Sequence, residues 1–240
     1  MTILRRFSLR FTCLTLLSSV IALGTPLIAQ GSVKDPTAAS ILAAAKISLT
    51  KEQGVHVKVV TFAGKVNSTL VADIGRVSGS ESYVSGNETF TITVTPTYAY
   101  LSGSASGLTK LIGLSSAEQK KVGTASMTMK KGTTEYTTFQ SDMTAGAFDQ
   151  LLPAVKGTTL LSERDKATNG YQLTWTVKAT TSVPKTKTTM VFSSGKTTLP
   201  LSDAVSNKDS HSTTTFSKWG EAVQITVPSK TITYAKVFSS

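Results

Sequence analysis

The sequence predicts an α+β fold in which short antiparallel strands form a curved sheet covered by a few helices. Many segments alternate an apolar residue with Thr, Ser or Lys, the period of a strand with one buried face. Turn residues such as Gly64-Lys65 and Gly86-Asn87 separate these segments at hairpin spacing. An apolar patch over 108–114 interrupts the strands at helical spacing. We expect this patch to form a small lid over the sheet.

The N-terminal part of the body is predicted to be a helix over 36–49. Asp35 is the expected capping residue, and Pro36 suits the first helical position. The apolar residues that recur at helical spacing are Ile41, Leu42, Ala45 and Leu49. The helix should end before Gly54, where the period changes from helical spacing to two.

Strands with one apolar face account for most of the remaining chain, and the cleanest alternation covers 171–178. The spacing predicts an antiparallel meander of hairpins in the first half. The expected strand segments are 55–59, 67–74, 89–95 continuing through Tyr98 and Tyr100, one with Met127 and Met129, 171–178, one with Met190 and Phe192, 213–216, and 223–227 closed by Pro228.

Two helical segments beyond the lid patch are predicted in the middle of the chain. Ser115 and Glu118 have the spacing of a capping box, which favours a polar turn through Lys121. A further helix is expected over 141–152, with Pro153 stopping it.

The first residues have the pattern of a secretory signal, with a basic start, an apolar run over 11–23 and a small-residue cleavage site at 29–31. We therefore expect a signal peptide over 1–31 and a single domain over 32–240, exported to the cell envelope or secreted. Cys13, the sole cysteine, follows Arg-Phe-Thr instead of the residues of a lipobox. A lipid anchor is therefore not expected, and the mature chain has no disulfide.

The formal net charge is +11, and the chain stays basic without the three arginines of the signal. Its lysines are spread over several segments, without the basic strip interleaved with aromatics that nucleic-acid binding favours. A solvated surface is the simplest interpretation. An anionic membrane surface is the partner that the remaining basic charge suggests, and the oligomeric state stays open.

Catalytic patterns are largely missing from the sequence. His56 and His211, the two histidines, fall at a polar strand position and in a polar loop, which fits neither a Ser-His-acid triad nor a metal site. No phosphate-binding glycine motif appears, so no cofactor is expected. Paired acids remain as a hydrolase alternative, either Glu163 with Asp165 or Asp203 with Asp209.

The C-terminal third resembles a known group of proteins. The segment 198–201, a polar turn around Asn207, the run 213–221 containing Phe216-Ser217-Lys218-Trp219-Gly220, and 223–228 look like the closing strands of the LolA/LolB-like and LppX/LprG-like envelope lipid-carrier superfamily. The resemblance implies a strongly curved antiparallel half-barrel closed by helices, with an apolar cavity that takes acyl chains. Relatives are usually lipoproteins, and this sequence departs from them in lacking a lipobox.

The resulting hypothesis is an exported, non-enzymatic binding protein for a lipid or other apolar molecule. An envelope sensory or protein-interaction module with the same fold is the alternative, and a hydrolase of unusual design is the third. Filled core is the competing interpretation for every candidate ligand-binding residue, since period-two faces look the same over a packed interior. The candidates are Leu108, Leu111, Ile112, Phe148, Leu151 and Leu152 as lid, and Ile92, Val94, Leu173, Trp175 and Val177 as wall.

Overall fold

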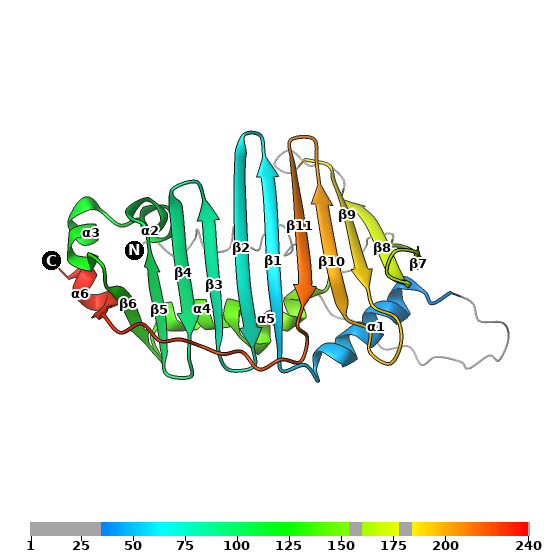
Figure 1. Cartoon of the computed structure of the whole chain (residues 1–240), viewed down its shortest axis with the longest axis horizontal. Coiled ribbons are helices and arrows are strands. Elements are labelled where there is room, and N and C mark those ends of the chain that lie inside the picture. The colour runs from blue at the N-terminus through cyan, green and yellow to red at the C-terminus, as the bar shows by residue number, and fades with distance from the viewer. Residues whose placement is uncertain (1–34, 154–159, 178–183, 240) are drawn as a thin grey trace.

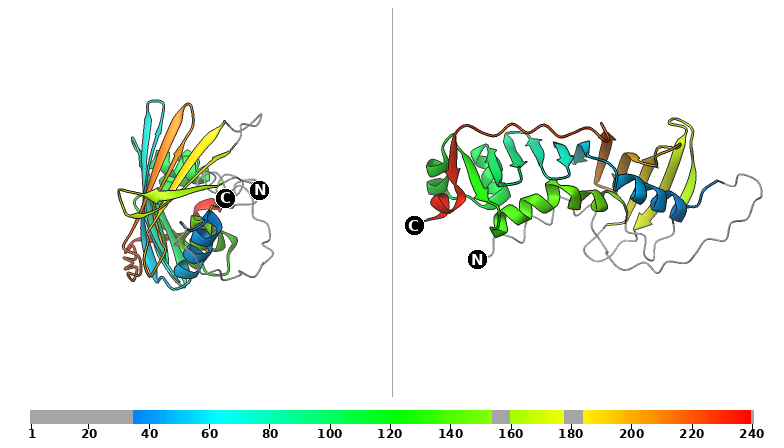
Figure 2. Two further views of the ribbon diagram at one scale, coloured as in Figure 1. Left: turned by 90° about the vertical axis from the view of Figure 1, so that its right-hand side faces the viewer. Right: turned by 90° about the horizontal axis from the view of Figure 1, so that it is seen from below.

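The computed structural model describes residues 35–153, 160–177 and 184–239, so the predicted signal segment 1–31 lies outside the described residues. At its centre is one twelve-stranded sheet in the order β12-β6-β5-β4-β3-β2-β1-β11-β10-β9-β8-β7 (Figure 1). Only the pair of β12 and β6 is parallel. The sheet curls, and helices cover its concave face (Figure 2). The predicted α+β fold with a curved antiparallel sheet is confirmed.

The first half of the sheet is the predicted meander. From β1 to β5 each strand pairs with the next through a short turn, and the two hairpin turns named above contain Gly64 and Gly86 at positive φ. β5 and β6 also pair, but the segment 104–125, which contains two helices, joins them. The strands are β1 (Gly54–Ala63), β2 (Val66–Gly75), β3 (Gly79–Ser85), β4 (Glu88–Val94), β5 (Tyr98–Gly103) and β6 (Ser126–Lys130).

The second half of the sheet comes from the C-terminal part of the chain. It joins the first half where β11 pairs with β1, for example Phe216 opposite Val57. One prediction was wrong here, because His211, expected in a loop, lies on β11. Residues 161–165, which no expected strand covers, form an edge strand. The strands are β7 (Leu161–Asp165), β8 (Gly170–Val177), β9 (Thr186–Phe192), β10 (Pro200–Ser206) and β11 (Ser210–Ser217).

The predicted N-terminal helix is present as α1 (Ala38–Leu49), with Ile41, Leu42, Ala45 and Leu49 buried. Its cap differs from the prediction. The side chain of Thr37, not Asp35, accepts a hydrogen bond from the Ser40 backbone N–H, so the helix begins two residues later than expected. Asp35 instead lies 3.7 Å from Arg164 of β7.

The middle of the chain forms α2 (Ala105–Ile112) and α3 (Ser116–Val122). The predicted capping box of α3 is confirmed, because Ser115 and Glu118 each accept from the other's backbone N–H. The hydrogen bond that the Ser115 backbone N–H donates to the Glu118 carboxylate lowers the pKa of Glu118, and a hydrogen bond with the Ser115 side chain lowers it further. This charge also suits the N-terminal end of a helix.

The helical region after β6 is longer than predicted and broken. It comprises α4 (Thr134–Met143), α5 (Ala145–Phe148) and the 3-10 turn η2 (Asp149–Leu151), not one helix over 141–152. Thr133 caps α4 by accepting from the Tyr136 N–H. The sequence signal for α4 is weak because its β-branched threonines have low helix propensity. Burial of Tyr136, Phe139 and Met143 against the sheet compensates.

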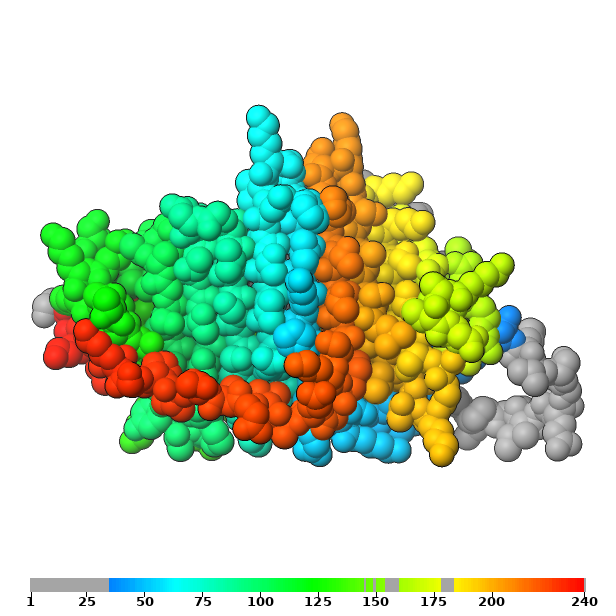
Figure 3. Space-filling view, viewed as in Figure 1, coloured from blue at the N-terminus to red at the C-terminus, as the bar shows by residue number. Residues whose placement is uncertain are grey.

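The predicted strand over 223–227 is wrong. Residues 221–228 lie outside any strand and cross the face opposite the helices, near the strand ends at Gly54 and Gly75 (Figures 2 and 3). A Cβ at Gly54 would lie 2.4 Å from the Glu221 oxygen, so only glycine admits this approach. Pairing begins after the crossing, where β12 (Thr231–Thr233) joins β6 and leads into α6 (Tyr234–Phe238).

The core lies between the concave face and the helices, in two clusters. The first contains the apolar residues of β4 to β6, α2 and α4, closed by Val237 of α6. The second contains those of α1, α5, β1, β2, β8, β9 and β11. In Figure 1, α1, α4 and α5 cross the strands nearer their lower ends, the end at which β1 begins and β2 ends. These helices therefore cover the lower part of the concave face more than its upper part.

Candidate functional site

A row of inward-facing residues crosses the concave face at mid-height. The register places each member opposite the next on the neighbouring strand, so all of them point to the same side of the sheet. We call this set the concave row: Leu173, Met190, Asp203, Thr214, Val59, Leu70, Tyr83 and Phe90.

Exposure changes along the concave row. Its outer members Leu173, Met190 and Phe90 are at most 2% exposed, whereas Val59, Leu70, Tyr83 and Thr214 in the middle are only half-buried. In the next row toward the helices, the neighbours of the middle members are nearly inaccessible, and Val57, Ala72 and Phe216 are at most 5% exposed. The middle of the concave row is therefore an apolar surface that the described helices do not fully cover.

Asp203 is the one acidic member of the concave row. It lies on β10 opposite Met190 of β9 and Thr214 of β11, and it is 3% exposed. Neither carboxyl oxygen has a hydrogen-bond partner among the described residues. Burial raises the pKa of Asp203 to about 7. A carboxyl group is thus held in an apolar wall without a partner for either oxygen.

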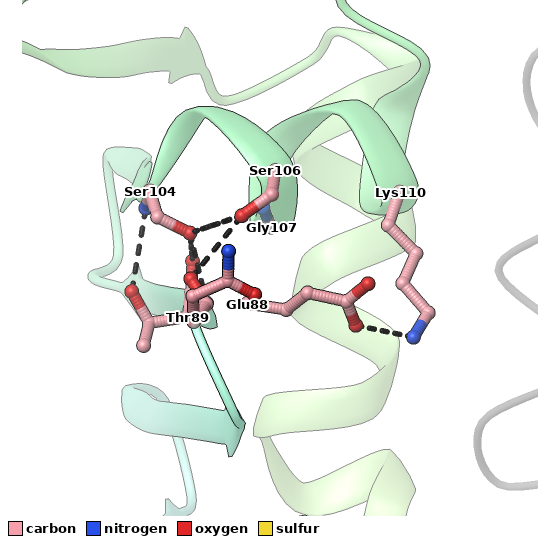
Figure 4. A network of polar contacts seen from close by, with 7 residues as sticks. Glu88, Thr89, Ser104, Ser106, Gly107 and Lys110 are labelled. Atoms are coloured by element: carbon pink, nitrogen blue, oxygen red, sulfur yellow. Dashed lines mark hydrogen bonds and ion pairs between the residues drawn. The ribbon is translucent and has the colours of Figure 1, made fainter.

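The predicted lid helix α2 is fixed to the sheet at its first turn (Figure 4). Ser104 caps it by accepting from the Gly107 N–H, and the Ser104 N–H donates to the Thr89 oxygen of β4 at 2.9 Å. A Cβ at Gly107 would lie 2.1 Å from that oxygen. An ion pair between Lys110 and Glu88 adds a second attachment. These contacts hold α2 against β4, and its apolar face completes the first cluster.

The predicted lid and wall residues do not form one site. Five of them pack together in the first cluster: Ile92, Val94, Leu108, Leu111 and Ile112. Phe148, Leu151 and Leu173 are buried in the second cluster, with Leu152 and Trp175 partly buried against it. Val177 is 40% exposed at the end of β8. Of the predicted set, Leu173 belongs to the concave row, and Trp175 lies one row above it, opposite Thr188.

Sequence reasoning missed most of the concave row as a candidate site. The apolar alternation of β1 and β2 already contains Val59 and Leu70, but it does not say which part of the face stays open. One usable signal was present. Asp203 occupies the inward phase between Leu201 and Val205, where an apolar residue is expected.

The two histidines have different partners, and the acids of the pair Asp203 and Asp209 differ in burial, while Glu163 and Asp165 lie together on β7. His56 Nδ1 lies 2.8 Å from Asp73 on the neighbouring strand, while His211 stacks on Phe62. Asp209 is exposed in the turn after β10, whereas Asp203 is buried within that strand. Within the described ranges, no group of three His, Cys, Asp or Glu is placed to hold a metal ion.

No protein-family model and no curated protein matches the sequence. Among solved structures, the chain is similar to the lipoprotein LppX of Mycobacterium tuberculosis, with 13% identity and a TM-score of 0.44 over 79% of this chain and 100% of that one. LprF of Mycobacterium bovis is similar with 12% identity and a TM-score of 0.44, over 78% and 95% of the two chains.

No helix in the described parts of the chain is long and apolar enough to cross a bilayer.

Proposed function

We propose that this chain is an exported, single-domain, non-enzymatic protein that binds a lipid or other apolar molecule along the middle of its concave face. The observation that carries the proposal is the half-burial of Val59, Leu70 and Tyr83, beside neighbours in the next row that are at most 5% exposed. Covering half-buried apolar side chains with a further apolar surface removes them from water, and this lowers the free energy of the complex. An acyl chain provides such a surface.

The hydrophobic effect is large enough for this role. Each buried methylene contributes about 0.8 kcal/mol, so a chain of roughly 12 methylenes gains about 10 kcal/mol before association costs are subtracted. Binding therefore requires no polar catalyst or metal. A face of aliphatic and aromatic side chains suffices for the affinity, and polar groups within it set the specificity.

The test uses purified, delipidated protein titrated with a fluorescent fatty acid, together with native mass spectrometry of protein isolated with its bound lipids. Saturable binding is expected. Leu70→Asp places a charge on the open apolar surface, so it should weaken binding at least tenfold.

The matched control is Val84→Asp. Val84 follows Tyr83 on β3, so it points to the opposite face, where it is 46% exposed. Affinity should be unchanged in this variant. Equal loss in both variants, or no saturable binding by the parent protein, would refute the proposal.

A further inference from the structure

Asp203 is the one acidic residue of the concave row. Its neighbours across the sheet are Met190 and Thr214, and the next inward residue along β10 is Val205. None of these three residues carries a charge. The carboxyl therefore has no cation at the positions that surround it in the sheet, and neither of its oxygens has a hydrogen-bond partner among the described residues.

An unpaired polar group in a protein interior is costly. More than nine in ten buried polar groups have a hydrogen-bond partner, and leaving one unpaired incurs its full desolvation penalty. A carboxyl group at an inward strand position can be replaced by an apolar side chain of similar size without that penalty. Asp203 nevertheless carries a carboxyl group on the row that we assign to the ligand. This indicates that the hydrogen-bond partner of the carboxyl is a group of the ligand.

The surroundings of Asp203 define the chemistry of that group. Burial favours the protonated carboxyl, because it raises the pKa of Asp203 to about 7. A protonated carboxyl has both a donor, its O–H, and an acceptor, its C=O. A hydroxyl group also donates and accepts, so one ligand hydroxyl can satisfy both oxygens. The half-buried hydroxyl of Thr214 on the adjacent strand provides a second polar contact at the same place.

We propose that Asp203 is a specificity-determining residue that hydrogen-bonds a hydroxyl group on the acyl chain of the ligand. This inference rests on the function proposed above and narrows the ligand to lipids whose apolar chain carries a hydroxyl. The apolar side chains of the concave row then provide the affinity, while Asp203 distinguishes chains of equal length by whether they carry a hydroxyl.

The experiment is competition of 12-hydroxystearic acid and stearic acid against a fluorescent fatty acid at pH 6. The parent protein should bind the hydroxylated chain about five- to tenfold more tightly, the range expected for one net hydrogen bond. Asp203→Asn keeps a donor and an acceptor, so it should retain the preference. Asp203→Leu removes both, so it should bind the two acids equally.

The outcomes separate this inference from the proposed function. Saturable binding with the same preference in the parent and in Asp203→Leu overturns the role of Asp203 and leaves the lipid-binding function standing. Tighter binding of hexadecylamine than of either acid, lost in Asp203→Asn, would assign Asp203 to a cationic group and overturn the hydroxyl. Failure of every probe to displace the fluorescent acid overturns both proposals.

Discussion

The guanidinium of Arg76 lies over the ring of Phe148, with 5.1 Å between Cζ and the ring centroid. The same group donates hydrogen bonds to the backbone oxygens of Leu49 at 2.9 Å and Glu52 at 2.7 Å. Leu49 ends α1, where carbonyl groups lack partners within the helix. One side chain at the end of β2 thus joins α1 and α5, the two helices that cover the second cluster.

Replacing this link should destabilise the fold. Arg76→Ala removes two charge-assisted hydrogen bonds and a cation–π contact, so the free energy of unfolding should fall by about 2–3 kcal/mol. Urea denaturation followed by circular dichroism measures the change. The control is Arg164→Ala. Arg164 lies on the exposed edge strand β7, and its Cζ is 4.9 Å from the centroid of the Tyr171 ring. That variant should lose less than about 1 kcal/mol. Equal losses would contradict the role of Arg76.

Two glycine-to-alanine changes should have opposite effects. At Gly107 a Cβ would lie 2.1 Å from the Thr89 oxygen, so Gly107→Ala must displace α2 from β4. At Gly146, exposed on α5, the nearest atom to a Cβ is 3.6 Å away. Alanine there should raise the melting temperature, because it gains about 0.5–1 kcal/mol over glycine in a helix. Thermal melts of the two variants should shift in opposite directions, and a neutral Gly107→Ala would show that α2 is not held closely.

The strand meander of the first half was predictable because its signals are local. Apolar alternation over 54–94 and glycines at the turns specify both the strands and their pairing with the next strand. The same local signal failed at 223–227. Alternation shows that one side of a segment is buried, but a strand also needs a neighbouring backbone in register, and this segment crosses the strand ends instead.

The candidate site could not be assembled from the sequence because it depends on long-range pairing. Val59 and Thr214 are opposite each other in the concave row, although more than half of the chain separates them. The partial exposure of Val59 depends on where the helices lie. The helix α4 was not predicted from the sequence, because its β-branched threonines have low helix propensity. Asp203 shows the limit most clearly, since its phase in β10 was readable but its lack of a partner required the surrounding side chains.

Ionisation of Asp203 should make the ligand-free protein less stable as the pH rises. Below pH 3.8 the carboxyl is protonated in both states, and between pH 3.8 and about 7 the unfolded chain releases the proton while the folded chain retains it. The unfolding free energy should fall by a total on the order of 4 kcal/mol across this pH range, because the folded state disfavours the ionised carboxyl. Unfolding free energies from pH 4 to 8 should therefore fall in the parent relative to Asp203→Asn, with the difference levelling above about pH 7.

Asp165→Asn provides the contrasting control. The side-chain hydrogen bond from Thr168 lowers the pKa of Asp165, so the parent should gain stability relative to this variant as the pH rises toward 3.8, and the difference should be nearly constant above that pH. A stability difference for Asp203→Asn that stays constant between pH 4 and 8 would show that water or another group compensates the buried carboxyl.

The two tryptophans allow the position of a bound chain to be measured. Trp175 lies one row from the concave row, whereas Trp219 packs beside Phe148 and Phe216 and donates from Nε1 to the Pro200 oxygen at 2.9 Å. A brominated stearic acid quenches an indole only at contact distance. Trp219→Phe, which keeps Trp175, should be strongly quenched on saturation, while Trp175→Phe should keep most of its fluorescence. Quenching confined to Trp219 would place the chain under α5 and contradict binding along the middle of the concave face.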